Sequence, residues 1–590
     1  MEEQKSFYKA QLELHKTEAS GIFKQMGLLS VLRILVFLLT AFGIYLTYLQ
    51  WQVSSLIGVL GIGVFLFLLS KYTDLKQKRA LHKRLVVINK DELDIASGDF
   101  HDRPGGGQFQ NPKHFYSLDI DLFGKGSFFQ FINRTTIKEG TETLTNNLLA
   151  NNILDIETRQ EAIKELVTIP EWRQYYSGVA QGVEVKHSAK SIITWLKDYK
   201  PFLSKIHYWF TIAFSLASVL ILVLGVTEVI SISFTGYWLL LGLGITAYYL
   251  KRINNVAQNT ERAKDTFRQY ALLLELIETE EFKSALLKDQ QHKIKSENLK
   301  ASQIFLKFSK ALDALDNRNN LISAIFGNGL LLWDLRQTHY IEQWITKYAD
   351  KVEDWFEVVT FFDAYNSLGN YAFNHQEFTY PEISNEATTI LADNLGHPLL
   401  KSEKRVDSDL TLEEEQFFIV TGANMAGKST FLRTVALHIV MANVGLPVCA
   451  KASKYKPIKL ITSMRTTDSL TDDSSYFFSE LTRLKFVVDT VTNDASYFII
   501  LDEILKGTNS TDKAIGSRKF VEKLVKLNAT GIIATHDLSL TEIEKELEAV
   551  KNYYFDAEII NDELYFDYKL KQGVCQNMNA SFLLKKMEIV

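Results

Sequence analysis

The stretch FFIVTGANMAGKST, residues 417–430, decides the fold of the last third of the chain. Its first five residues are apolar or β-branched and are typical of a buried strand. The glycine loop that follows has the GxxxxGK[ST] pattern, whose backbone N–H groups and helix N-terminus surround phosphate oxygens. We therefore predict a strand, a phosphate-binding loop and then a helix that begins near Lys428.

Each loop position has an expected part in nucleotide binding. Gly422 and Gly427 permit the tight turn, Lys428 can reach the β- and γ-phosphates, and the Ser429 hydroxyl can bind Mg²⁺. The predicted nucleotide-binding residues are Gly422, Ala423, Asn424, Met425, Ala426, Gly427, Lys428, Ser429 and Thr430. Chance occurrence of the pattern is the alternative, but the strand and helix on either side disfavour it.

Two further apolar runs end in residues that suit ATP hydrolysis. Tyr497–Leu501 precedes Asp502 and Glu503, a Walker B arrangement in which Asp502 holds Mg²⁺ and Glu503 orients or deprotonates water. His536 follows the run at 531–535 and can contact the γ-phosphate or the water. The alternatives are a solvated acidic turn and a structural histidine.

A small polar segment, Gly507-Thr-Asn-Ser-Thr-Asp512, follows the acidic pair. It could bind phosphate or cap a helix, and Thr511 and Asp512 are good N-cap residue types. Considered alone, the residue types favour the cap.

Bulk composition excludes several classes of protein. The chain has 590 residues, 12% of them aromatic, and only eight prolines, so a largely disordered chain is disfavoured. A net charge of −5 gives no global basic signature, so a nucleic-acid surface would be local. The two cysteines, Cys449 and Cys575, are too few for a disulfide framework and fit a reducing compartment.

Two apolar blocks predict membrane-spanning helical hairpins. No charged side chain occurs from Ile34 to Ser70, and a second block covers about 209–250. Lysine and arginine follow both blocks and are missing from their short connecting loops, so the loops are predicted to face outward. Buried helices of a soluble core are the alternative. The hairpins would place the protein in the inner, cytoplasmic membrane as a multi-pass protein, with its ATPase domain in the cytoplasm.

These signals divide the chain into five parts. We expect an N-terminal segment with a hairpin (1–71), a cytoplasmic part (72–205), a second hairpin (206–252), a helical lever (253–400) and an ATPase domain (401–590). The expected fold is an α/β P-loop ATPase domain that follows a mostly α-helical core.

The motifs together resemble the MutS family of DNA mismatch-repair ATPases. Asn424-Met425 inside the loop is specific to that family, and Ser475–Glu480, Asp502–Ile504, Gly507-Thr508 and Ala534–His536 are similar to further family blocks in the same order. Weaker similarity extends upstream to Leu118–Gly124 and Gly396–Pro398 and covers about residues 100–590, and Gly573–Val590 resembles the end of the ATPase domain.

The resemblance implies an ABC-like ATPase that uses ATP and Mg²⁺ and works as a homodimer. Glu503, His536 and Lys428 would then be catalytic, while Ser429 and Asp502 would hold the metal. Thr508, Asn509 and Ser510 would reach the γ-phosphate bound by the partner subunit, and Ser475 would assist. This segment reads Gly-Thr-Asn-Ser, where mismatch-repair members usually have Gly-Thr-Ser-Thr.

DNA binding does not follow from the resemblance alone. The family's mismatch-reading domain and its Phe-x-Glu wedge are not found, and its C-terminal helix-turn-helix element is expected to be short or missing. The family's helical arms clamp duplex DNA through phosphate contacts. The candidate arm, about 251–400, carries acidic residues interleaved with Lys283, Lys288, Lys293, Lys295, Lys300, Lys307 and Lys310.

Three functions remain open. The motifs favour a membrane-anchored MutS-like ATPase that acts on duplex DNA, whether mismatched or structured. The anchor and the missing mismatch reader favour a membrane-tethered ATP-dependent switch or scaffold with a protein or lipid partner. An ABC transporter is disfavoured, because four spans are few and the apolar blocks lack polar pathway residues.

Overall fold

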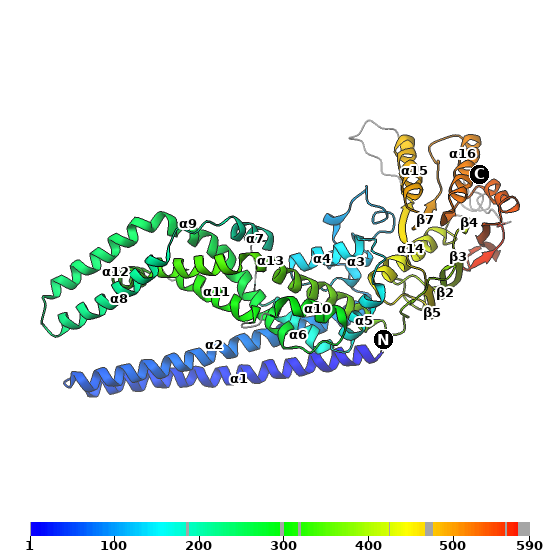
Figure 1. Ribbon diagram of the computed structural model, residues 1–590. Coiled ribbons are helices and arrows are strands. Elements are labelled where there is room, and N and C mark those ends of the chain that lie inside the picture. Colours follow the sequence, from blue (N-terminus) through cyan, green and yellow to red (C-terminus); the bar gives the residue numbers. More distant parts are fainter. Residues whose placement is uncertain are drawn as a thin grey trace.

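The computed structural model describes residues 2–183, 188–295, 300–316, 320–423, 425–465, 476–560 and 563–575. The molecule is elongated, with helices over most of its length and an α/β part at one end (Figure 1). The predicted helical core followed by an α/β region is therefore confirmed at the level of architecture. Asn424, Ser475 and residues 576–590 lie outside the described residues.

Two long helical hairpins extend from the core. The first pairs α1 (Glu2–Leu46) with α2 (Trp51–Ala96), and the second pairs α8 (Lys205–Val226) with α9 (Ile232–Thr279). Both hairpins turn at the end of the molecule that lies away from the α/β part (Figure 1). Of the helices in the described residues, α1, α2 and α8 are long and apolar enough to cross a membrane.

The helices do not stop where their apolar segments stop. Residues 71–96 contain no glycine or proline, and α2 continues through them into the core. In the same way α9 runs unbroken from Ile232 to Thr279. The predicted boundaries after residues 71 and 252 therefore fall inside single helices, which connect the apolar ends rigidly to the core.

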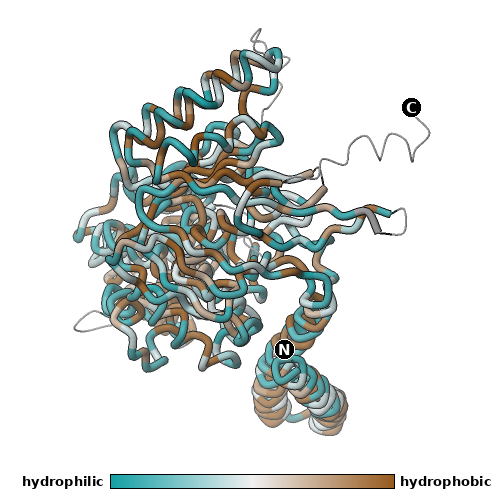
Figure 2. Tube along the Cα trace, turned by 90° about the vertical axis from the view of Figure 1, so that its right-hand side faces the viewer, coloured by the Kyte–Doolittle hydropathy of each residue, from teal (hydrophilic) through white to brown (hydrophobic). Residues whose placement is uncertain are grey.

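The helical core surrounds α13 (Trp333–Asn374), a long helix with many buried residues along its second half. Other helices pack against it, and the N-terminal hairpin lies below the rest as a separate rod with brown, apolar turns (Figure 2). The remaining core helices are α3 (Phe128–Ile132), α4 (Lys138–Leu149), α5 (Ile156–Val167), α6 (Pro170–Ala180), α7 (Ala189–Asp198), α10 (Ala285–Ile294), α11 (Ala301–Asp316) and α12 (Asn328–Leu331).

A four-stranded sheet connects this core to the rest of the α/β part. Its strand order is β1 (Glu382–Ile383), β5 (Ala452–Tyr455), β2 (Thr388–Leu395) and β3 (Ser408–Glu413). β1 and β2 come before residue 401, in a stretch that was expected to be almost entirely helical. The β-branched run Thr388-Thr-Ile favours a strand there.

The second sheet has six strands and carries the predicted motifs. Their order is β12 (Leu570–Gln572), β9 (Val550–Phe555), β4 (Phe417–Gly422), β8 (Thr530–Ala534), β7 (Tyr497–Asp502) and β6 (Lys459–Ser463), and only β12 is antiparallel to its neighbour. Helices α14 (Lys428–Val444), α15 (Tyr476–Asn493) and α16 (Ser510–Lys526) connect or flank the strands.

Strand β4 is buried on both of its faces. Phe417 and Ile419 belong to one hydrophobic cluster, while Phe418 and Val420 belong to the other. This alternation explains why residues 417–420 have no polar side chain, as expected for a central parallel strand.

An ionic contact fixes the helical core against the sheet. Arg433, on α14, donates to the Asp119 carbonyl at 3.2 Å, and Arg465 pairs with Asp121 at 2.7 Å. Thr462, at the end of β6, donates its hydroxyl proton to the Asp119 carboxylate at 2.5 Å. The segment Leu118–Gly124 therefore joins the core to the helix that follows the glycine loop.

Candidate functional site

Three neighbouring strands bring the predicted site residues together. β4, β8 and β7 are adjacent and parallel, so their carboxyl ends lie at one edge of the sheet. The glycine loop follows β4, Asp502 and Glu503 stand at the end of β7, and His536 lies just after β8. Residues separated by more than 100 positions in the chain therefore share one site.

The glycine loop requires its two glycines. Gly422 has φ 147° and Gly427 has φ 105°, a region that other residues rarely adopt. A Cβ at Gly422 would also lie 2.7 Å from the Phe555 carbonyl oxygen. Met425 has φ 69° and exposes 78% of its surface, so it projects outward from the loop. Ala426 is buried and Thr430 is exposed.

Lys428 hydrogen-bonds to the backbone of the glycine loop. Its ammonium group donates to the carbonyl oxygens of Gly422 at 2.8 Å and Ala423 at 2.9 Å, and it lies 3.3 Å from His536 Nε2. Burial lowers the pKa of Lys428, while Glu503 and Asp502 partly offset this effect. A phosphate would give this buried cation an anionic partner.

The two predicted metal ligands are in direct contact. The Ser429 hydroxyl donates to Asp502 Oδ2 at 2.7 Å, at the N-terminus of α14. Hydroxyl and carboxylate oxygens are the ligands that Mg²⁺ prefers, and Mg²⁺ commonly takes only one or two protein ligands beside phosphates and water. The described residues contain no group of three or more His, Cys, Asp and Glu suited to a metal ion. The donor set therefore fits Mg²⁺.

Glu503 and His536 form a hydrogen-bonded pair. His536 Nε2 lies 2.7 Å from Glu503 Oε1, and this bond lowers the pKa of Glu503 to about 2. The Glu503 backbone has φ 49°, and its N–H donates to the Ala534 carbonyl at 2.9 Å. A non-glycine residue at positive φ stores strain, typically ~1–3 kcal/mol, and this strand contact holds it in place.

Two neighbouring residues at this edge were not predicted. The Lys506 ammonium lies 3.7 Å from Glu503 Oε2, and Glu480 of α15, almost fully buried, accepts from the Lys506 backbone N–H at 3.2 Å. Glu480 ends the block Ser475–Glu480, which resembles the family, but its contact with Lys506 depends on α15 packing beside the segment after β7. A third residue that was not predicted is Tyr568, which lies beside the loop, where a Cβ at Gly427 would be 3.2 Å from its ring.

The segment after Glu503 is a capped helix start. Asn509 is the N-cap of α16 and accepts from the Asp512 backbone N–H at 2.9 Å. The expected cap is therefore present, but Asn509 supplies it in place of Thr511 or Asp512, because the helix begins at Ser510. Asn509 and Ser510 are exposed and Thr508 is half-buried, so the segment faces outward.

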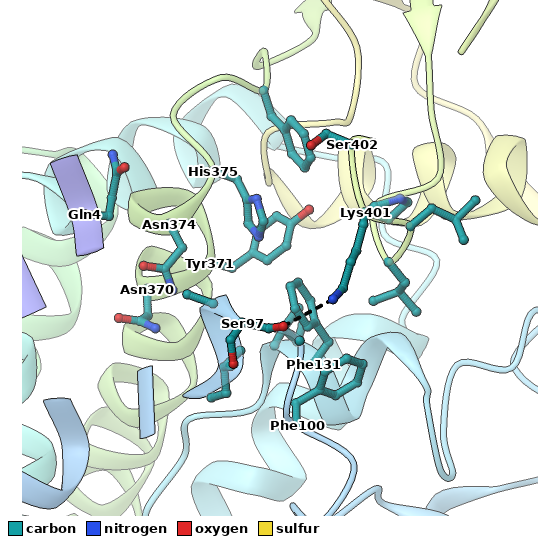
Figure 3. A pocket seen from close by; sticks show the side chains of 18 of the residues that line it. Gln4, Ser97, Phe100, Phe131, Asn370, Tyr371, Asn374, His375, Lys401 and Ser402 are labelled. Carbon is teal, nitrogen blue, oxygen red and sulfur yellow. Dashed lines mark hydrogen bonds between the residues drawn. The ribbon is translucent and has the colours of Figure 1, made fainter. Parts of the chain in front are cut away.

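A separate cavity of about 510 Å³ lies at the junction of α1, α2, α13 and residues 398–405 (Figure 3). Asn370, Tyr371, Asn374 and His375 line it from the end of α13, and Lys401 donates to the Ser97 carbonyl at 3.3 Å across it. None of the predicted nucleotide residues lines this cavity. It marks the place where the N-terminal hairpin, the long core helix and the entry to the sheets meet.

Comparison with known proteins finds similarity in the C-terminal part. The family model "MutS domain V" matches residues 418–586. The chain is 31% identical to the DNA mismatch repair protein MutS of Acetivibrio thermocellus over 212 residues, which are 35% of this chain and 24% of that protein. It is 29% identical to the corresponding protein of Staphylococcus haemolyticus over 242 residues, 40% of this chain and 27% of that protein.

A eukaryotic relative gives the same result. Human MutS protein homolog 4 is 34% identical over 217 residues, 35% of this chain and 23% of the human protein. The match thus spans about a quarter of the length of each relative. These findings support the MutS family for the region that holds the glycine loop, Asp502, Glu503 and His536.

Proposed function

We propose that the protein is a membrane-anchored MutS-like ATPase, in which ATP binding and hydrolysis drive a dimer switch on DNA. The observation that carries the proposal is the meeting of the glycine loop, the Ser429–Asp502 contact and the Glu503–His536 pair at one sheet edge. The match of the same residues to MutS domain V supports it independently.

The side chains have distinct tasks in this mechanism. Lys428 leaves the two loop carbonyls and binds the β- and γ-phosphates, while the loop N–H groups surround the phosphate oxygens. Ser429 and Asp502 would hold Mg²⁺, which supplies charge neutralisation between the phosphates when bound. Ionised Glu503 accepts a hydrogen bond from the attacking water and orients it, and His536 holds that carboxylate in position.

Dimerisation would use the exposed segment at 508–510. A helix N-terminus that faces outward suits an anionic phosphate held by a second copy of the chain. A two-fold dimer would then contain two nucleotides between its subunits, closed by ATP and loosened by hydrolysis.

The membrane anchor is proposed from the two hairpins. Large apolar side chains along α1, α2 and α8, such as Phe37, Leu60 and Leu220, are more than half exposed. A soluble surface rarely presents so much contiguous apolar area. The shared direction of both hairpins lets one bilayer contain both (Figure 1).

ATP turnover by purified protein tests the enzymatic assignment. Glu503→Gln is expected to bind ATP normally and to lose at least ~100-fold in turnover, since the carboxylate that orients the water is gone. Lys428→Ala should instead weaken ATP binding. Glu542→Gln, which removes an exposed carboxylate paired with Lys545, is the matched control and should leave both unchanged.

The same variants report on the dimer switch. With ATP, the Glu503→Gln variant should accumulate as a dimer in mass photometry, because hydrolysis no longer opens the closed state. Normal turnover by Glu503→Gln would contradict the catalytic assignment. A monomer in every nucleotide state would contradict the dimer switch while leaving the ATPase assignment intact.

A membrane-tethered switch with a protein partner and no DNA is the second candidate. The observation in its favour is that two basic residues of the arm, Lys264 and Arg268, form ion pairs with acidic residues of the arm. Lys264 pairs with Asp316, and Arg268 pairs with Asp313 at 2.6 Å. Cations engaged in this way are less available to phosphates, whose neutralisation drives nonspecific DNA binding.

A further inference from the structure

A second apolar surface lies on the core beside the α8–α9 hairpin. The residues from Asn320 to Trp333 carry no charged side chain, although charged residues precede them in α11 and follow at Asp334. They form a short π-helix (Ser323–Gly327) and then α12. The length of this run is too short for a membrane span and is typical of a re-entrant or interfacial segment.

Three large apolar side chains in the first half of this segment point outward. Leu321 and Ile322 are 73% and 70% exposed, and Phe326 is 54% exposed. Side chains of this size at the turn between α11 and α13 have no core to fill. Large apolar side chains that are this exposed are stabilised by contact with an apolar partner.

The segment packs directly against the proposed membrane hairpin. A Cβ at Gly242 of α9 would lie 2.2 Å from the Gly329 carbonyl oxygen, so the two backbones touch. Ser215 of α8 donates to the Leu331 carbonyl at 3.3 Å. Small residues that allow close backbone approach are typical of helix contacts inside bilayers.

The position of this contact along α9 gives its depth. Gly242 is ten residues after the start of α9 at Ile232, which corresponds to ~15 Å of helix rise. That distance is about half of the ~30 Å hydrocarbon core. If the α8–α9 hairpin spans the bilayer, residues that touch Gly242 lie near its middle.

The ends of the segment suit this environment. Trp333 donates its indole N–H to the Ala314 carbonyl at 2.9 Å, so this polar group is satisfied within the protein. Asn328 accepts from the Asp334 backbone N–H at 2.9 Å, and the Ala324 N–H donates to the Asn320 carbonyl at 2.8 Å. Internal hydrogen bonds of this kind are what a segment in lipid needs.

We infer that residues 321–332 dip into the bilayer beside α8 and α9, so that the far end of the α11–α13 arm is embedded in lipid. The inference rests on the membrane anchoring proposed above. The exposed apolar patch then contacts lipid acyl chains, since the patch continues the apolar surface of the hairpin. One end of α13 is then held in the membrane while its other end leads to the sheets (Figure 1).

Lipid-based fluorescence quenching tests the inference on the full chain. Cys449 and Cys575 are buried and would be replaced by serine, and single cysteines at Phe326, Leu220 or Leu154 would carry the environment-sensitive dye NBD. Leu220 is an exposed residue of α8, and Leu154 is an exposed apolar residue between α4 and α5, remote from the hairpins. Each labelled protein would be reconstituted into phosphatidylcholine vesicles containing doxyl-labelled lipids and checked for ATP binding.

The dye at Phe326 is expected to be quenched as strongly as the dye at Leu220 and several-fold more than the dye at Leu154. Quenching at Leu220 without quenching at Phe326 would overturn the inference and leave the anchor in place. A blue-shifted but unquenched dye at Phe326 would also overturn it, in favour of a protein interface. Absence of quenching at Leu220 would contradict membrane spanning by the α8–α9 hairpin and would overturn the inference with it.

Discussion

At the scale of single residues, the Glu503–His536 pair sets the protonation state of the site. A carboxyl group whose pKa is about 2 is ionised throughout the neutral range and is a weak base. A carboxylate of this kind suits the proposed orientation of water better than the removal of a proton. The positive φ of Glu503 aims this carboxylate toward His536, away from the ordinary strand direction.

Removal of the histidine ring should shift the pH dependence of turnover. In His536→Ala the pKa of Glu503 rises from about 2 toward its ordinary value of 4.5, because its main stabilising hydrogen bond is lost. Activity that needs ionised Glu503 would then fall at a higher pH than in the parent protein. Turnover at a series of acidic pH values measures this shift, and an unchanged acid limb would contradict the proposed pairing.

Substitution of Ser429 tests how much Mg²⁺ contributes to ATP affinity. Ser429→Ala removes one of the two protein oxygens proposed for Mg²⁺, so Mg²⁺ should increase ATP affinity much less than in the parent protein. Titration of a fluorescent ATP analogue with Mg²⁺ or with EDTA measures the difference. Ser539→Ala is the matched control, because Ser539 also donates to an aspartate but lies outside the site.

At the scale of elements, a buried polar network joins the N-terminal hairpin to α13. Arg134 pairs with Glu92 of α2 at 2.5 Å, and the Asn370 side chain donates to the same carboxylate at 3.0 Å. Tyr8 of α1 donates to Asn374 at 2.7 Å. Burial raises the pKa of Glu92, but Arg134 outweighs that effect, so the pKa of this carboxyl lies below its usual range.

Glu92→Gln should destabilise the protein, because Arg134 would be left as a buried cation without its counter-charge. Breaking such a pair typically costs ~3–5 kcal/mol. The melting temperature in detergent should fall clearly, whereas Glu13→Gln, at the exposed pair with Lys16, should leave it unchanged. Equal melting temperatures would show that the network does not hold α2 to the core.

The same pair has a definite pH signature. The folded pKa of Glu92 is depressed, so its contribution to stability is present above the unfolded pKa of ~4.3 and is lost as pH falls through the folded value. The difference in melting temperature between the parent protein and Glu92→Gln should therefore be full near pH 7. It should shrink only below about pH 4, as Glu92 becomes protonated.

At the scale of the whole molecule, the question is whether the arm contacts DNA. A MutS-like protein acting on DNA should bind duplexes in detergent with affinity that falls steeply with salt, since phosphate contacts release counterions. Titration of matched and mismatched duplexes at several salt concentrations measures this. Absence of binding to either duplex would exclude the DNA function and favour the tethered switch with a protein partner. Equal binding to both would mean DNA contact without mismatch recognition.

The C-terminal third of the fold could be predicted from the sequence because its signals are local. A strand, a glycine loop and a helix are specified by about fourteen consecutive residues, and the carboxyl ends of parallel strands must meet at one edge. The helical hairpins were predicted in the same way from long apolar runs. The N-cap at Asn509 and the strands before residue 401 were missed, since short polar and β-branched stretches are compatible with several local structures.

Local residue patterns were thus enough to predict the glycine loop, the acidic pair after β7 and the apolar hairpins. The contacts between Glu503 and His536, between Glu480 and Lys506, and between residues 321–332 and α9 are visible only in the folded chain. The physical reason is that these contacts join segments distant in the chain, through strand order and helix packing. Local residue patterns do not specify which distant surfaces come into contact.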